Sequence, residues 1–74
     1  MLQELRKAKG LSQSKLANAT GISYRTIQQW EIGGRNINNA SLSNMIKLAY
    51  TLDCNISDLL TDEELKNQCK KVTL

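Results

Sequence analysis

Residues 13–32 read QSKLANATGISYRTIQQWEI, with a single glycine, Gly21, near the middle. Side chains suited to the buried face of a helix recur at helical spacing on both sides of that glycine: Leu16, Ala17 and Thr20, then Ile27 and Trp30. The segment therefore predicts two short helices, at about 13–20 and about 23–32, joined by a tight turn.

The turn is expected at Gly21. A residue that ends one helix and reverses the chain usually needs a positive φ, which glycine adopts without a steric penalty from a β-carbon. Ser23 follows with a side-chain oxygen that can cap the second helix. Ala17 lies one turn before the glycine and is small enough to let the two helices cross closely.

The outward face of the second predicted helix carries hydrogen-bonding side chains rather than the Lys and Glu of an ordinary solvated face. Placing residues every 100° puts five of them on the arc opposite the apolar pair: Tyr24, Arg25, Gln28, Gln29 and Ile32. Arginine can donate two parallel bonds to guanine, and glutamine can both donate to and accept from adenine. We therefore expect Tyr24, Arg25, Gln28 and Gln29 to read bases. Tyr24 can meet a thymine methyl group, a phosphate or only solvent.

The chain resembles the Cro/repressor-type (XRE-like) helix-turn-helix regulators of phages and bacteria over residues 2–60. The motifs that carry the resemblance are spread along the chain: LRKAKGLSQ at 5–13, Leu16-Ala17, Gly21-Ile22-Ser23, Ile27, Trp30-Glu31 and ISDLL at 56–60. The resemblance implies an all-α, five-helix, lambda-repressor-like domain. It also implies that the third helix enters the major groove of double-stranded DNA.

The resemblance further implies an ion pair between Arg6 and Glu31, although Arg6 can also be read as an ordinary solvated arginine. It implies that Gln13, at a helix N-terminus that favours phosphate, contacts the DNA backbone and braces Gln29; a generic polar residue of a first helical turn is the alternative. The residues expected to contact phosphates are Gln13, Thr26, Arg35, Asn36 and Arg6. Trp30 shares a face with Ile27, which favours core packing over stacking on bases.

The second half of the chain predicts scaffold. Residues 33–40 form a polar loop with two glycines, in which Arg35 is the only basic residue. Ser41 is expected to open a helix whose core stripe recurs at a period of 3.6 residues: Leu42, Met45, Ile46, Ala49 and Leu52. Asp53 takes its C-cap position, and a short fifth helix follows at about 56–60. The first helix is expected at about 2–9, with Leu2, Leu5 and Ala8 facing inward.

The C-terminal segment, residues 61–74, predicts one more helix at about 62–71, outside the domain at 1–60. Thr61 and Glu64 have the spacing of a capping box. Leu65, Cys69 and Val72 form a narrow apolar stripe, which must pack on the domain or on a second copy of the chain. Residues 73 and 74 are expected to fray.

Length and charge limit the functions that fit. A chain of 74 residues makes one small domain and leaves no room for a second, ligand-sensing one. The net charge is +3, and it is uneven: residues 1–35 contain six basic and two acidic residues, whereas residues 36–74 contain four and five. The positive half contains the segment at 13–32, which suits a polyanion.

Several classes of function are disfavoured by what the sequence lacks. It has no apolar run long enough for a membrane span and no signal-peptide pattern, so a cytoplasmic protein is expected. Cys54 and Cys69, without any histidine, predict small buried side chains rather than a zinc site or a disulfide framework. No metal or other cofactor is expected. The absence of histidine, of an evident acid pair and of a glycine-rich phosphate loop argues against an enzyme.

These observations predict a sequence-specific regulator that binds double-stranded DNA, most readily a repressor acting on a palindromic operator as a homodimer. The alternative is a protein-interaction module of the same architecture, such as the antitoxin partner of a toxin.

Overall fold

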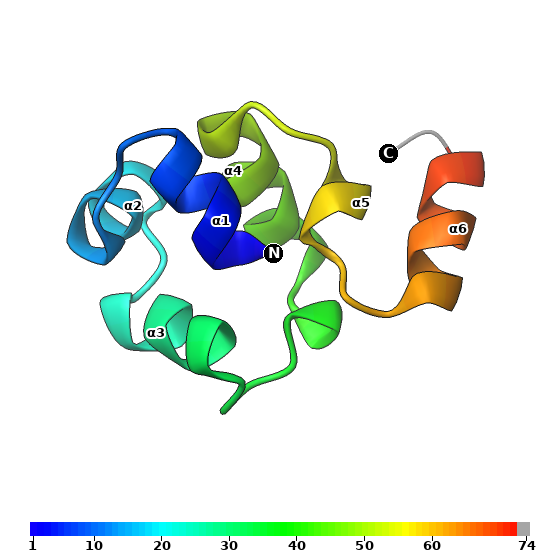
Figure 1. Cartoon of the computed structure of the whole chain (residues 1–74), viewed down its shortest axis with the longest axis horizontal. Coiled ribbons are helices and arrows are strands. Elements are labelled where there is room, and N and C mark those ends of the chain that lie inside the picture. The colour runs from blue at the N-terminus through cyan, green and yellow to red at the C-terminus, as the bar shows by residue number, and fades with distance from the viewer. Residues whose placement is uncertain (73–74) are drawn as a thin grey trace.

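The computed structural model describes residues 1–72, so the fraying expected at residues 73 and 74 lies outside the described residues. Within that range the chain forms six α-helices, one 3₁₀ turn and no strand, which confirms the all-α prediction (Figure 1). The elements are α1 (Leu2–Ala8), α2 (Gln13–Thr20), α3 (Tyr24–Ile32), the 3₁₀ turn η1 (Ile37–Asn39), α4 (Leu42–Leu52), α5 (Ile56–Leu59) and α6 (Glu63–Lys71). No helix in the described part is long and apolar enough to cross a membrane.

The turn between α2 and α3 has the predicted chemistry. Gly21 ends α2 with a φ of 73°, and its backbone N–H donates to the carbonyl of Ala17. The Ser23 hydroxyl oxygen caps α3 by accepting from the backbone N–H of Thr26 at 3.2 Å. The Thr20 hydroxyl donates to the Leu16 carbonyl at 2.7 Å and accepts from the Ile22 backbone N–H at 3.2 Å. These local bonds fix the direction in which α3 leaves the turn.

The core lies where α2, α3, α4 and α5 meet. Its four fully buried large side chains come from four different helices: Leu16, Ile27, Leu48 and Leu59. Burying a side chain of this size contributes roughly 1.5–3 kcal/mol relative to leaving it exposed. The position of each of these helices therefore depends on its neighbours. Ile27, on the side of α3 opposite its outward face, holds α3 in place.

The predicted core stripe of α4 is wrong in part. Met45, Leu48 and Leu52 are the buried residues of this helix, whereas Leu42 and Ile46 are 56% and 51% exposed. Apolar residues occupy most of the circumference of α4, so periodicity alone left two adjacent stripes to choose between. Packing against α2 selects the one that contains Leu48.

Three smaller expectations about the scaffold also needed correction. Ala8 is exposed rather than inward, and α1 ends there. The loop expected to be polar contains η1, where Ile37 is only 6% exposed. The fifth helix ends at Leu59, and Asn55 opens it through a backbone N–H that donates to Asp58. The C-cap of α4 is as predicted, because Asp53 has a φ of 52°.

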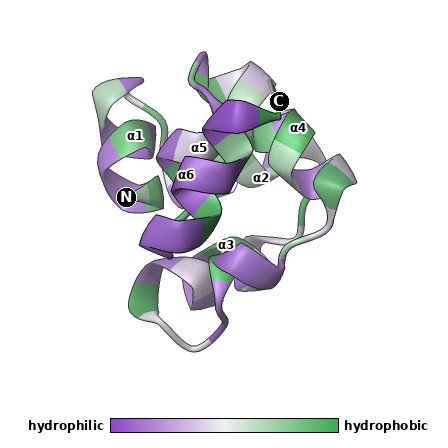
Figure 2. Ribbon diagram, turned by 90° about the vertical axis from the view of Figure 1, so that its right-hand side faces the viewer, coloured by the Kyte–Doolittle hydropathy of each residue, from purple (hydrophilic) through white to green (hydrophobic). Residues whose placement is uncertain are grey.

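The last helix is capped differently from the prediction. Asp62, not Thr61, is the N-cap of α6, and its carboxylate accepts from the backbone N–H of Leu65 at 3.1 Å. Thr61 lies outside the helix because its hydroxyl and backbone N–H bond to Asn38. α6 packs on α5 of its own domain, with its polar side outward (Figure 2). Cys69 is its one buried residue among those described.

Candidate nucleic-acid interface

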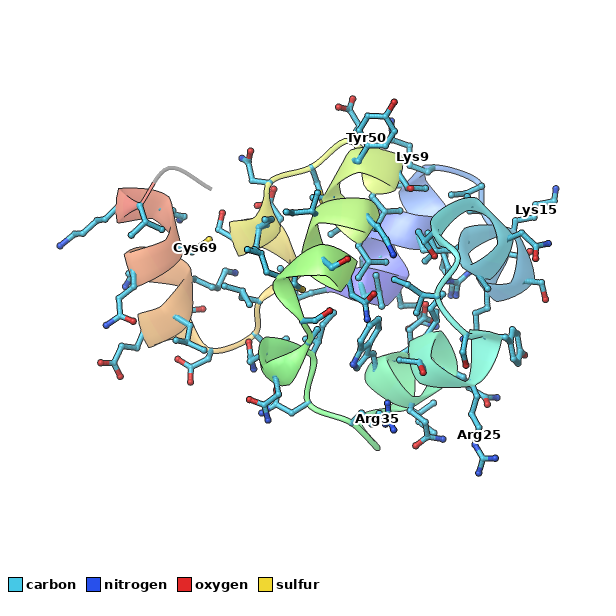
Figure 3. All side chains as sticks on the ribbon, turned by 180° about the vertical axis from the view of Figure 1, so that it is seen from behind. Lys9, Lys15, Arg25, Arg35, Tyr50 and Cys69 are labelled. Carbon is cyan, nitrogen blue, oxygen red and sulfur yellow. The ribbon has the colours of Figure 1, made fainter. Side chains whose placement is uncertain are left out.

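The outward side of α3 is open to solvent at its N-terminal end. Tyr24 is 46% exposed, and Arg25 is exposed with no side-chain hydrogen bond within residues 1–72. Arg25 and Arg35 lie on the same side of the molecule, and Tyr50 and Lys9 lie on the opposite side (Figure 3). Two cations from separate segments therefore face the same side.

Gln28 and Gln29 of α3 are half-buried, and the side chain of Gln29 contacts the loop that follows the helix. A β-carbon built at Gly34 would overlap the Oε1 atom of Gln29. The φ of Gly34 is not positive. The Gln29 amide thus packs directly against Gly34, in the space that a β-carbon would occupy. The sequence predicts this glycine only as one of two in a polar loop, and its contact with Gln29 has no signal in the sequence.

We expect Gly34→Ala to change sequence preference without loss of stability. The added methyl group must push the Gln29 side chain aside, which is cheap because that side chain is flexible. Gly→Ala at an allowed φ changes stability by about 1 kcal/mol at most, in the favourable direction. The comparison is duplex selection by Gly34→Ala and by Gln29→Ala, which should alter preference at the same base pair. An unchanged preference in Gly34→Ala would show that this placement of Gln29 has no role in reading.

Arg6, Gln13 and Glu31 form a buried hydrogen-bonded network that joins α1, α2 and α3. Arg6 donates from Nε and Nη2 to the two carboxylate oxygens of Glu31, at 2.7 and 2.9 Å, and from Nη1 to the Leu11 carbonyl at 2.8 Å. The Gln13 amide donates to the same carboxylate at 3.0 Å. The side chains of Arg6 and Glu31 are 9% and 2% exposed. This bidentate geometry is the strong form of an ion pair.

The network bears on two implications of the family resemblance, the phosphate contact of Arg6 and the contact of Gln13 with Gln29. Arg6 is 8% exposed and each of its three guanidinium nitrogens donates a hydrogen bond within the network, which favours the ion pair with Glu31 over a phosphate contact. Gln13 bonds to Glu31 rather than to Gln29, because the carboxylate is the stronger acceptor. Gln13 is half-buried, and it holds the C-terminal end of α3 against the start of α2.

The network sets the charge state of Glu31. Burial by itself raises the pKa of this carboxyl group, but hydrogen bonds from Arg6 and Gln13 and the charges of Arg6 and Lys7 together hold it below its usual 4.5. The hydrogen bond to Glu31 in turn raises the pKa of Arg6. Both groups are therefore ionised at neutral pH.

The lowered pKa of Glu31 predicts an acid-dependent loss of stability. A carboxyl group with a lower pKa in the folded state stabilises the fold fully above its unfolded pKa, and that contribution disappears as the pH falls through the folded pKa. We expect the free energy of unfolding to decline below about pH 4.5. Urea unfolding at several pH values checks this, with Glu31→Gln as the comparison. If Glu31→Gln and wild type lose stability in parallel, Glu31 is not the group responsible.

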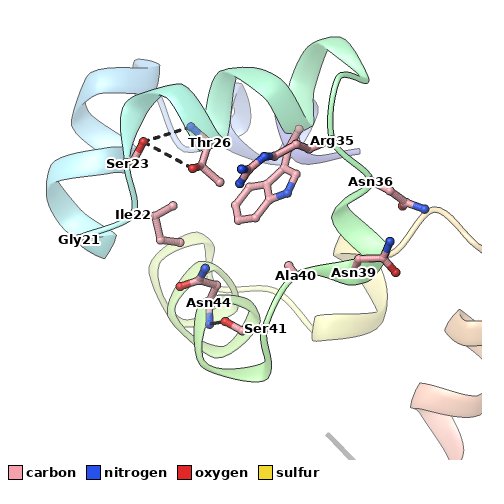
Figure 4. A pocket seen from close by; sticks show the side chains of 11 residues that line it. Gly21, Ile22, Ser23, Thr26, Arg35, Asn36, Asn39, Ala40, Ser41 and Asn44 are labelled. Carbon is pink, nitrogen blue, oxygen red and sulfur yellow. Dashed lines mark hydrogen bonds between the residues drawn. The ribbon is translucent and has the colours of Figure 1, made fainter.

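A polar cleft of about 540 Å³ opens between the first turn of α3 and the N-terminus of α4 (Figure 4). Its lining includes three residues predicted to contact phosphate, Thr26, Arg35 and Asn36. It also includes four polar or aromatic residues that were not predicted there: Trp30, Asn39, Ser41 and Asn44. Ser41 was recognised as the cap of α4, but its position across from α3 depends on the course of the loop.

The cleft suits an anion. Arg35 is its one charged lining residue, and no acidic side chain lines it in the part of the chain that the structure describes. The first turn of α4 points at it, with Ser41 accepting from the backbone N–H of Asn44 at 3.1 Å. A smaller hollow of about 100 Å³ adjoins, lined by Ser23, Arg25, Thr26, Gln29 and Arg35. Residues predicted to read bases and residues predicted to contact phosphates thus meet on one surface.

Trp30 is half-buried, so its ring both packs against the core and lines the cleft. Cys54 is half-buried and Cys69 is buried, and both are free thiols. Within residues 1–72, no three His, Cys, Asp or Glu side chains lie close enough to hold a metal ion.

Comparison with known proteins agrees with this geometry. A family model described as helix-turn-helix matches residues 2–59, more than half of the chain, from α1 to the end of α5. No curated protein and no solved structure gave a significant match. The chain belongs to the Cro/C1-type, XRE-like helix-turn-helix family of DNA-binding regulators.

Proposed function

We propose that this protein is a sequence-specific regulator that binds double-stranded DNA and acts as a repressor by occupying its operator. The observation that carries the proposal is the surface on which the hydrogen-bonding face of α3, with Tyr24 and Arg25 exposed, adjoins a cleft whose described lining residues include a cation and no acid. A major groove about 12 Å wide admits one α-helix, and the outer face of α3 presents the exposed side chains of Tyr24 and Arg25, which can hydrogen-bond to base edges there.

The proposed contacts to DNA divide into two groups with different functions. Arg25, Gln28, Gln29 and Tyr24 lie on α3 and read base edges. The second group positions the domain on the backbone of the duplex: Gln13, Thr26, Arg35 and Asn36. Phosphate contacts supply affinity and register without sequence information, whereas base contacts supply specificity. The buried pair of Arg6 and Glu31 fixes the angle between α1 and α3. Repression then needs no chemical step, because a bound domain blocks other proteins from the same site.

Two copies of the chain act together in this proposal. One α3 contacts only a few base pairs, too few to select one site among many. Dimers of such modules bind half-sites about 34 Å apart, one turn of the duplex, so that the operator is palindromic. A homodimer on a palindrome is the arrangement we propose.

Duplex binding at two salt concentrations tests the proposal. The affinity for a mixed-sequence duplex should fall steeply between 50 and 200 mM salt, with a logarithmic slope of about −0.9 for each phosphate contacted. Charge-reversal of the cleft by Arg35→Glu should abolish this binding, whereas Lys70→Glu on α6 should not. A protein-interaction module, the alternative, would bind duplexes weakly and without dependence on Arg35.

A further inference from the structure

The side chain of Asn38 uses all four of its hydrogen-bonding positions. Its oxygen accepts from the backbone N–H groups of Thr61 and Asp62, at 2.9 and 3.1 Å. Its nitrogen donates to the Thr61 hydroxyl at 2.8 Å and to the Asn36 side-chain oxygen at 2.7 Å. An asparagine amide has two donors and two acceptor sites. Asn38 therefore joins the loop before α4 to the linker before α6, segments that are 23 residues apart.

On the loop side, Asn38 orders the residues next to the cleft. The Asn36 oxygen accepts from both the backbone N–H and the side chain of Asn38, at 3.0 and 2.7 Å. Asn36 follows Arg35, and both line the cleft. Arg35 is otherwise held by a single backbone bond, from its N–H to the Gln29 carbonyl at 3.2 Å. Loss of the Asn38 hydrogen bonds would free the segment that carries Arg35, the one cation among the described residues that line the cleft.

On the other side, α6 packs on α5, but little of its own surface is buried. Cys69 is 8% exposed, but the other apolar residues of its stripe, Leu65 and Val72, are 39% and 62% exposed. An apolar groove of about 320 Å³ remains between α6 and the exposed side of α4. An element with so little buried surface belongs to the least stable part of a domain. The bonds from Asn38 to Thr61 and Asp62 hold its first turn in place.

We propose that Asn38 couples the docking of α6 to the phosphate-contacting loop, so that a docked α6 raises affinity for DNA. This coupling rests on the proposed DNA-binding function. Asn38 is a positioning residue here, because it acts on DNA through Asn36 and Arg35. Linkage makes the effect reciprocal: if docking of α6 strengthens DNA binding, bound DNA must hold α6 docked by the same factor. Anything that pulls α6 off α5 would then weaken binding to the operator by that factor.

The reciprocity gives a direct test that uses Cys69 as a reporter. This thiol lies between α6 and α5 (Figure 3), so its rate of modification by iodoacetamide reports undocking of α6. Mass spectrometry of the peptides separates Cys69 from Cys54, which is not on α6 and serves as an internal reference. The rates are measured with and without a saturating mixed-sequence duplex. Affinity for that duplex is measured in parallel at two salt concentrations.

Asn38→Ala should speed modification of Cys69 and weaken DNA binding by about fivefold, the lower end of usual coupling factors. The slope of its logarithmic affinity against logarithmic salt concentration should be smaller by about one, which corresponds to the loss of one phosphate contact. In wild type the duplex should slow modification of Cys69 by a similar factor, and in Asn38→Ala it should not. Asn67→Ala, an exposed asparagine on α6, is the matched control and should behave as wild type. Thr61→Val, which removes one of the four bonds, should give smaller changes in the same directions.

Two results would overturn the coupling. One is an Asn38→Ala protein with faster Cys69 modification but unchanged DNA affinity and salt slope, which would make Asn38 a tether for α6 alone. The other is a wild-type protein that binds the duplex while its Cys69 rate stays the same. Both are distinguishable from failure of the proposed function, in which wild type binds duplexes only weakly and without dependence on Arg35. Should Asn38→Ala fail to fold, Thr61→Val decides between the same outcomes.

Discussion

Glu31→Ala should lower the free energy of unfolding by about 3–5 kcal/mol, because it leaves the Arg6 guanidinium buried without its counter-charge. Neither side chain has access to enough water to replace the lost bonds, since they are 9% and 2% exposed. A domain of 74 residues has about 4–11 kcal/mol of stability in total, so a loss of this size leaves a substantial unfolded fraction. Urea unfolding followed by circular dichroism at neutral pH measures it.

Two further variants separate the buried pair from acidic residues in general. Glu4→Ala removes a carboxylate that is 81% exposed and 3.2 Å from the N-terminal amine, and should cost less than about 1 kcal/mol. Arg6→Met combined with Glu31→Leu removes both charges, and should recover most of the stability lost in Glu31→Ala. A Glu31→Ala protein that is no less stable than Glu4→Ala would contradict the structural role of the network.

Arg25→Ala should relax sequence preference at one base pair of each half-site by about 1–3 kcal/mol, the worth of one bidentate contact to a base. The fold should be unaffected, because Arg25 is exposed and makes no side-chain hydrogen bond within the described residues. Competition binding with duplexes that differ at single base pairs gives the discrimination directly. The loss should be confined to one position per half-site.

Arg35→Ala is the control for Arg25→Ala, because it removes an equal charge from the same side of the molecule (Figure 3). It should weaken binding to all sequences alike and reduce the salt slope by about one. The ratio of affinities for different sequences should stay as in wild type. If the two variants behave alike, the division into base-reading and phosphate-contacting residues is wrong.

Features set by local chemistry could be predicted from the sequence. α2 and α3 begin at the serine caps Ser12 and Ser23 and end at Gly21 and Gly33, which adopt a positive φ. All four residues act on backbone groups within a few residues of themselves. The buried face of α3 follows from Ile27, and its outward face from the residues a half-turn away. Such features need no knowledge of the rest of the fold.

Features set by tertiary packing could not be predicted. Leu48 rather than Ile46 enters the core, because only the position of α2 distinguishes the two stripes of α4. Thr61 looks like a cap in sequence, yet it is taken by Asn38, 23 residues away. The cleft beside α3 likewise depends on where the loop places Ser41 and Asn44. Resemblance supplied the pair of Arg6 and Glu31, which spacing alone does not suggest.

The central claim is that α3 reads the edges of bases, and selection from a pool of random duplexes tests it most directly. The wild-type protein should enrich one short motif repeated as a palindrome, with half-site centres about one helical turn apart. The same selection with Arg25→Ala should return that palindrome with one position per half-site degenerate. Recovery of duplexes with no shared motif, or of the same motif unaltered by Arg25→Ala, would contradict the claim.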